Sequence, residues 1–130
     1  MAIRIVRLGS ARTPDEGLRI GTVRRPPRGV PKARFASDDW YDVWYPNLAP
    51  SVPVMKLAQA ATTEAQWQAF ARAYRREMAA PDAAHSIALL AALSARTGLA
   101  LGCYCADETR CHRSILRELL RDAGAVIAPD

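Results

Sequence analysis

Apolar and polar residues alternate at the start of the chain, and this alternation predicts a strand. Ile3 and Ile5 alternate with arginines over residues 2–8, and a period of two places apolar side chains on one face of a strand. A second alternating stretch, residues 18–24, predicts another strand. The prolines in residues 24–29 exclude regular structure there, because proline fixes φ and has no backbone N–H.

Apolar residues recur at helical spacing in the middle of the chain. Residues 63–79 carry one apolar stripe, which is the pattern of an amphipathic helix. Thr63 and Gln66 have the spacing of a capping box, so we expect the helix to begin there. A shorter helix is predicted over residues 54–61. The stripe consists of Trp67, Phe70, Ala71, Tyr74 and Met78.

A third helix is predicted over residues 83–96, because this segment is rich in Ala and Leu and carries little charge. We expect Pro81 to end the preceding helix and Asp82 to cap the new one. Gly98 is the expected residue after its last turn, where a left-handed conformation favours glycine. The low charge indicates a helix that packs against a sheet.

The stretch from residue 99 to residue 123 predicts a buried strand, a polar loop and a helix. The strand is expected over residues 99–105 and the helix from about Cys111 to Ala123, followed by Gly124. A last strand is expected over residues 125–127. All three cysteines of the chain lie in this stretch.

The order helix, strand, helix, strand in the second half is typical of an α/β fold. We expect a single small domain over residues 1–130, with a mostly parallel sheet and helices on its faces. Ligands of such sheets bind at the carboxyl ends of the strands. The loop after residues 99–105 is therefore the predicted place of a functional site.

Composition limits the class of protein. The chain has 130 residues, half of them hydrophobic, which is enough for one domain with a core. No run reaches the roughly 18 apolar residues that a membrane span needs, and the start of the chain lacks the apolar run of a signal peptide. We therefore expect a cytoplasmic protein, with its three cysteines reduced and no membrane partner.

The formal charge of +5 permits an anionic partner. Nearly all of the basic residues are arginines, with Lys32 and Lys56 the exceptions. Arginine favours bidentate contacts with phosphate and carboxylate, but a GC-rich genome also enriches arginine. The basic segment at residues 24–34 is a candidate contact for nucleic acid.

Reactive side chains gather between the predicted strand and the last helix. Cys105, Cys111 and His112 are the candidate catalytic residues, because a helix start stabilises a thiolate and histidine transfers protons near neutral pH. Arg110 and Arg113 flank them, and guanidinium groups bind phosphate or carboxylate. We therefore predict an anion-binding site at this strand-to-helix junction.

Two other chemistries fit the same stretch. The three cysteines with His112 form a Cys3His set of the kind that binds zinc. Adjacent residues on a helix point about 100° apart, however, and Cys103 has the sequence context of a core residue, so we assign no metal ligand and no cofactor. Alternatively, the stretch resembles the active loop of rhodanese-like sulfurtransferases, which implies a persulfide on Cys105.

Three stretches together resemble the bacterial family named domain of unknown function 488 (DUF488). They are Pro-Arg-Gly at residues 27–29, Ala-Pro-Ser at residues 49–51 and Cys-His-Arg at residues 111–113. The resemblance covers about residues 21–124. It implies a small α/β domain without an established activity, and it supports one site that combines Arg28 with the Cys-His-Arg motif.

The favoured hypothesis is an enzyme that acts on an anionic small molecule, such as a phosphorylated or nucleotide-like substrate. Arg28 and Arg113 would bind the anion, His112 would move a proton, and Cys105 or Cys111 would be the nucleophile. The first alternative is a module that binds nucleic acid or a protein without catalysis. The second alternative is a sulfurtransferase that uses Cys105.

Overall fold

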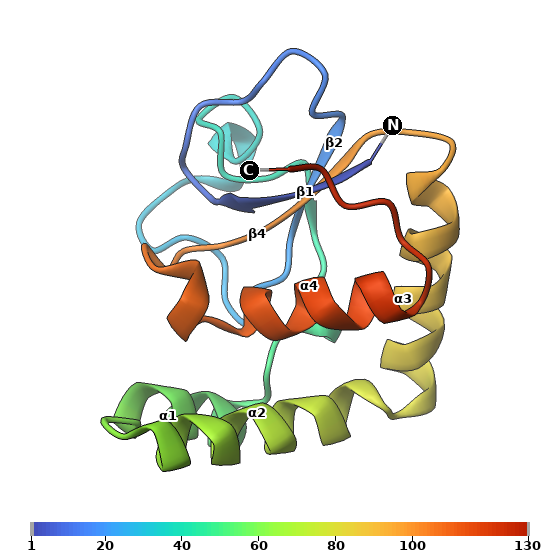
Figure 1. Ribbon diagram of the computed structural model, residues 1–130. Coiled ribbons are helices and arrows are strands. Elements are labelled where there is room, and N and C mark those ends of the chain that lie inside the picture. The colour runs from blue at the N-terminus through green and yellow to red at the C-terminus, as the bar shows by residue number, and fades with distance from the viewer. Residues whose placement is uncertain (1, 130) are drawn as a thin grey trace.

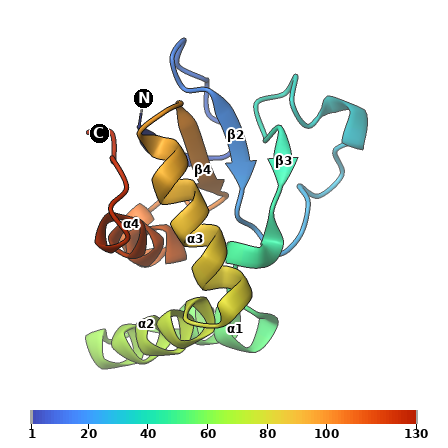
Figure 2. The same ribbon diagram turned by 90° about the vertical axis from the view of Figure 1, so that its right-hand side faces the viewer.

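The structure is a computed structural model and describes residues 2–129. Within them, four strands form one sheet in the order β1-β4-β2-β3, and every pair of neighbouring strands is parallel. Figure 2 shows β4, β2 and β3 side by side. The predicted α/β fold is therefore confirmed. The strands are β1 (Ile3–Arg7), β2 (Leu18–Gly21), β3 (Val43–Trp44) and β4 (Leu99–Cys103).

Helices connect β3 to β4 and follow β4. The α-helices are α1 (Val52–Ala60), α2 (Glu64–Met78), α3 (Pro81–Ser94) and α4 (His112–Asp122). In Figure 1 they lie on one side of the sheet, whereas the loops that precede β2 and β3 lie on the other. Short 3-10 helices are η1 (Lys32–Arg34), η2 (Pro46–Leu48) and η3 (Glu108–Arg110).

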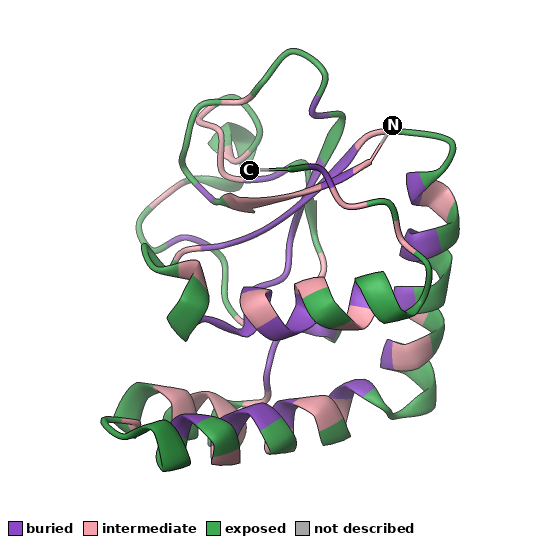
Figure 3. Ribbon diagram, in the orientation of Figure 1, coloured by how far each residue is buried: buried purple, intermediate pink, exposed green. Residues whose placement is uncertain are grey.

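The main core lies between the sheet and the helices. Ile20 and Leu101 face each other across neighbouring strands and contact the buried stripes of the helices. These stripes appear as recurring purple segments of α2 and α4 in Figure 3. The predicted stripe of α2 is buried as expected, and its capping box is present: the Gln66 N–H donates to Thr63 Oγ1 at 3.1 Å, and the Thr63 N–H donates to Gln66 Oε1 at 3.2 Å.

Loops cover the opposite face of the sheet. Arg19 points to that side and is fully buried, with its guanidinium bound to the carboxylate of Glu16 at 2.7 and 2.9 Å. Gly21 allows the ring of Tyr41 to pack on the strand, because a Cβ there would lie 2.4 Å from that ring. The four α-helices thus cover one face of the sheet, and loops supply the layer on the other face.

Several predicted boundaries differ from the structure. β2 ends at Gly21 and β4 at Cys103, so the residues after them are free to form the walls of a site. Helix α3 begins at Pro81 with Ala80 as its N-cap, so Asp82 lies in the first turn instead. The last predicted strand is reduced to a single bridge between Ile3 and Ile127.

Gly98 does not have the left-handed conformation expected after a helix. It is packed against the backbone instead, since a Cβ there would lie 2.9 Å from the carbonyl oxygen of Asp15. Gly124 does have a positive φ of 92° after α4, as predicted. Within residues 2–129 no helix combines the length and apolar content that crossing a membrane requires.

Candidate functional site

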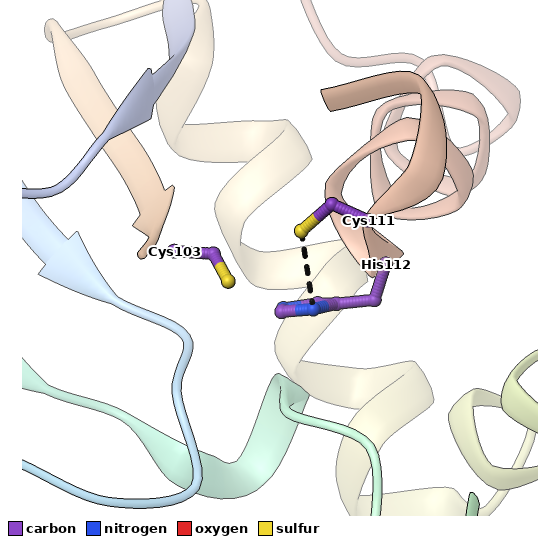
Figure 4. Close-up of side chains that lie close together, drawn as sticks. All are labelled: Cys103, Cys111 and His112. Atoms are coloured by element: carbon purple, nitrogen blue, oxygen red, sulfur yellow. Dashed lines mark hydrogen bonds between the residues drawn. The ribbon is translucent and has the colours of Figure 1, made fainter. Parts of the chain in front are cut away.

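Three potential metal ligands meet where β4 ends and α4 begins. Cys103 is the last residue of β4, and Cys111 and His112 are the N-cap and first residue of α4. One ligand atom from each lies within 4.8 Å of the other two, and all three residues are buried. Figure 4 shows the Cys111 sulfur beside the imidazole, at 3.7 Å from Nδ1, with the Cys103 sulfur directed toward the same space.

The sequence predicts that the side chains of Cys111 and His112 point about 100° apart, but in the structure they lie close together. Two adjacent residues inside a helix would diverge, but Cys111 has φ −133° and ψ 153°, which is extended backbone. An N-cap residue adopts such angles because it precedes the first helical residue. Its side chain can therefore point toward the same space as the imidazole of its neighbour.

The orientation of the His112 ring is fixed by the end of β2. Nε2 lies 2.8 Å from the main-chain carbonyl oxygen of Thr22, and that oxygen can only accept a hydrogen bond. Nε2 therefore carries the proton in the neutral ring, and Nδ1 presents a lone pair toward Cys111. The Thr22 hydroxyl donates to the carbonyl of Gly102 in β4 at 3.0 Å, so the residue that orients His112 is itself hydrogen-bonded to β4.

Cys105 brings a third thiol to the cluster. Its sulfur lies 3.7 Å from that of Cys103, and it is the exposed one of the three free cysteines. Hydrogen bonds from the Cys103 and Cys105 thiols lower the pKa of Cys111 and outweigh its burial. The pKa of Cys103 is raised, because it hydrogen-bonds to both neighbouring sulfurs and is buried. Of these two buried thiols, Cys111 is therefore the one that loses its proton more readily.

Arg113 supports the loop rather than facing a ligand. It is 3% exposed, and its Nη1 and Nη2 atoms donate to the carbonyl oxygens of Val6 at 2.7 Å and Cys105 at 2.6 Å. These bonds occupy both terminal nitrogens of the guanidinium. They join the end of β1 to the residue that carries the exposed thiol, so Arg113 positions Cys105.

Arg110 and Arg28 lie in different places. Arg110 lines the cavity next to the cysteines, pairs with Glu64 at 3.1 Å, and lies over the ring of Trp67 at 5.4 Å. Arg28 lines a separate cavity. The structure therefore does not gather the arginines of the sequence-based hypothesis around one anion.

A cavity of about 350 Å³ opens onto the cysteine cluster, and we call it the cysteine cavity. Helices α1 and α2 contribute Met55 and Phe70 to its wall, and none of the residues from 2 to 129 that line it is acidic. Arg24, Arg25 and Arg110 give it a positive charge. It lies at the carboxyl end of β4, where parallel sheets bind ligands.

Sequence reasoning found one of two further residues of this site and missed the other. Cys103 is buried in a core cluster, as its sequence context indicated, and it also belongs to the ligand group that the Cys3His alternative contained. Thr22 had no signal at all, because it acts through its main-chain carbonyl, which every residue possesses. Cys105, a candidate from the sequence, is exposed and lines the cysteine cavity.

Comparison with known proteins identifies one family. The model of DUF488-N3a, described as the active DUF488-N3 subclade, matches residues 3–124. No curated protein matches the chain, and no solved structure does.

Proposed function

The chain belongs to the DUF488 family, and we propose that its Cys–His cluster binds one Zn²⁺ ion in the service of an enzyme that acts on an anionic substrate. The observation that carries this proposal is the position of three buried donor atoms, beside which an exposed fourth donor lies next to one of them. The three buried atoms lie within 4.8 Å of one another, and the fourth, Cys105 Sγ, lies 3.7 Å from Cys103 Sγ. In a tetrahedral site with zinc–sulfur bonds of about 2.3 Å, two sulfurs are about 3.8 Å apart.

Two of the donors are prepared for zinc, and binding of the ion would release the protons of the other thiols. Nδ1 of His112 presents a lone pair because Nε2 donates its proton to the Thr22 carbonyl, which is the usual outer-shell arrangement of a metal-bound histidine. The thiol with the lowered pKa is Cys111, which can enter the site as a thiolate. Thiolate and imidazole ligands together suit zinc better than magnesium or calcium.

Access to the cluster supports an enzymatic rather than a purely structural centre. Three donors are buried and fixed, whereas Cys105 is exposed and lines the cysteine cavity. Catalytic zinc sites have three protein ligands and keep one position for water or substrate. Here the exposed Cys105 would have to leave the ion to open that position, in which bound water would have a lowered pKa. The basic lining of the cavity favours an anionic substrate with an apolar part, because it contains arginines beside Met55 and Phe70.

Metal content tests this proposal directly. Purified protein loaded with Zn²⁺ and freed of excess ion should retain about one equivalent, and Co²⁺ should produce thiolate-to-metal absorption. Cys111→Ser should abolish retention, because it removes a buried ligand. Cys105→Ser should weaken retention without abolishing it, because water can replace an exposed ligand. Unmodified protein without metal affinity, or Cys111→Ser protein that retains zinc normally, would overturn the proposal.

A metal-free thiol enzyme is the second candidate, favoured by the exposure of Cys105 at the cavity. In that case Cys105 would be the nucleophile, as in the sulfurtransferase hypothesis, and Arg113 would hold its backbone. Alkylation of each cysteine, followed by peptide mass on untreated and chelator-treated protein, separates the two. Equal, rapid alkylation of Cys105 in both samples supports the thiol enzyme. Protection that chelation removes supports the metal centre.

A further inference from the structure

A second cavity lies beside the cysteine cavity and carries a different chemistry. It has a volume of about 700 Å³ and is lined by Arg7, Arg25, Arg28, Trp40 and Tyr104 among others. We call it the arginine cavity. Arg25 and Tyr104 line both cavities, so the two are neighbours. Arg7 ends β1 and Tyr104 follows β4, which places the arginine cavity at the carboxyl ends of the strands.

The arginine cavity has positive charge without a counter-ion of its own. Among the described residues, three arginines and no acidic residue line it. Arg7 donates from Nε to the Tyr104 carbonyl at 3.3 Å, and within residues 2–129 the guanidinium groups of Arg25 and Arg28 make neither a hydrogen bond nor an ion pair. The nearby carboxylates of Asp39 and Asp42 are bound by Arg12. The lining therefore suits a multiply charged anion such as phosphate.

The segment that carries two of these arginines is held in place. Pro26 and Pro27 lie between Arg25 and Arg28 and fix the backbone φ there. The Tyr104 hydroxyl donates to the Arg25 carbonyl at 2.8 Å, which fastens the segment to the end of β4. A preorganised segment loses less conformational entropy when a ligand binds.

Trp40 supplies an aromatic wall. Its ring contacts Tyr104 edge to face, with centroids 5.9 Å apart. It also packs against the backbone of Gly9, where a Cβ would lie 3.1 Å from the ring. The indole is half-buried and still lines the cavity. A fixed aromatic ring beside arginines is the combination on which nucleic acid bases stack while their phosphates are bound.

We propose that the arginine cavity binds a nucleoside phosphate unit, with the arginines contacting phosphate oxygens and Trp40 stacking on the base. The volume is within the range of small-ligand pockets. The same unit occurs as a free nucleotide and within a single strand of nucleic acid. Although the two cavities share Arg25 and Tyr104, Arg28 and Trp40 line only the arginine cavity, so substitutions of these two residues test this site separately from the proposed zinc centre.

Titration calorimetry with AMP, and anisotropy with a labelled single-stranded oligonucleotide, test the proposal on zinc-loaded and chelated protein. Arg28→Gln should weaken binding about tenfold or more, as loss of a charge-assisted hydrogen bond does. Trp40→Leu should weaken binding of AMP much more than binding of ribose 5-phosphate, which has no base. Arg72→Gln is the matched control, because Arg72 is exposed on α2 away from both cavities and the change lowers the net charge equally.

The outcomes separate the two sources of the ligand. AMP that binds at least as tightly as the oligonucleotide supports a free nucleotide. Tighter oligonucleotide binding that falls steeply with salt supports a single strand. If neither probe binds, or if Arg28→Gln behaves like Arg72→Gln, the proposal is overturned. If AMP or the oligonucleotide still binds after chelation, binding in the arginine cavity does not require zinc, and the two proposals can fail separately.

Discussion

The imidazole of His112 donates through Nε2 to the main-chain carbonyl of Thr22 at 2.8 Å, across 90 residues of sequence. This bond attaches the start of α4 to the residue after β2. It also determines which nitrogen faces the cysteines. One contact therefore combines a structural role with the preparation of a metal ligand, and the two roles can be separated by mutation.

His112→Gln separates these roles. The Gln side-chain NH₂ can reach the position of Nε2 and donate a hydrogen bond to the Thr22 carbonyl. Glutamine has no metal-ligating atom at the position of Nδ1, however. We expect Zn²⁺ affinity to fall by more than about 100-fold, the upper end of the effect of losing an outer-shell partner. The melting temperature of metal-free protein should change little. Competition with a chromophoric chelator measures the affinity.

The matched control for this experiment is His85→Gln. His85 is the other histidine of the chain and is exposed on α3. Its substitution should leave zinc affinity unchanged. Equal affinities for His112→Gln and His85→Gln would show that Nδ1 of His112 is not a ligand.

Glu16→Gln should destabilise the fold strongly. Glu16 and Arg19 form an ion pair in which the side chains are 2% and 0% exposed. Removing one charge leaves the other buried without its partner, which costs about 3–5 kcal/mol. Urea unfolding followed by circular dichroism gives the change in free energy of unfolding.

The control for the buried pair is Asp38→Asn, which breaks the more exposed ion pair between Arg34 and Asp38. A solvent-exposed pair contributes about 1 kcal/mol or less. A loss for Glu16→Gln no larger than that for Asp38→Asn would contradict a stabilising role for the buried pair.

Asp42 should make stability depend on pH. Burial opposes its charge, but hydrogen bonds from the Arg12 side chain and the Arg19 N–H outweigh burial and lower the pKa of Asp42. The folded state therefore binds the proton less readily than the unfolded chain, whose aspartates have a pKa of about 3.9. The contribution of Asp42 is complete above that value and is lost as the pH falls through the lower folded pKa.

Urea unfolding of the wild type and Asp42→Asn between pH 7 and pH 3 measures this effect. The difference in free energy of unfolding should be constant near neutral pH and should shrink toward the acidic end. A difference that grows on acidification would contradict the lowered pKa of Asp42.

Gly17→Ala should destabilise the fold more than Gly124→Ala. Both glycines have a positive φ, 80° and 92°, so each alanine carries the strain of a left-handed conformation, about 1–2 kcal/mol. At Gly17 the new Cβ would also lie 2.0 Å from the Gly98 carbonyl oxygen, whereas at Gly124 it meets nothing within 4 Å. Equal losses of stability in thermal unfolding would show that the backbone contact relaxes without cost.

The contact between Gly17 and Gly98 also shows the limit of sequence reasoning. Gly98 was expected to end a helix, because glycine after an Ala-rich helix is typical of a helix C-terminus. The structure uses it for a close approach of two backbones, and the partner lies about eighty positions away. Nothing in the local sequence distinguishes these two uses of glycine.

Local spacing determined the elements of this protein. The capping box of Thr63 and Gln66, the apolar stripe of α2 and Gly124 after α4 were all predictable, because each depends on residues within about one turn. A buried strand close to residues 99–105 and a helix that starts beside Cys111 were predictable for the same reason, although the strand ends two residues earlier than predicted, at Cys103. An α/β fold followed from their order.

Only the tertiary structure decided how the site is assembled. It brought Cys103 close to Cys111 and His112, and it buried Arg113, whose guanidinium donates to main-chain carbonyl oxygens. It also placed Arg28 in a separate cavity. These relationships depend on the insertion of β4 between β1 and β2 and on the extended backbone at Cys111. Such contacts form between distant residues only when the chain is packed, so no local pattern of residues encodes them.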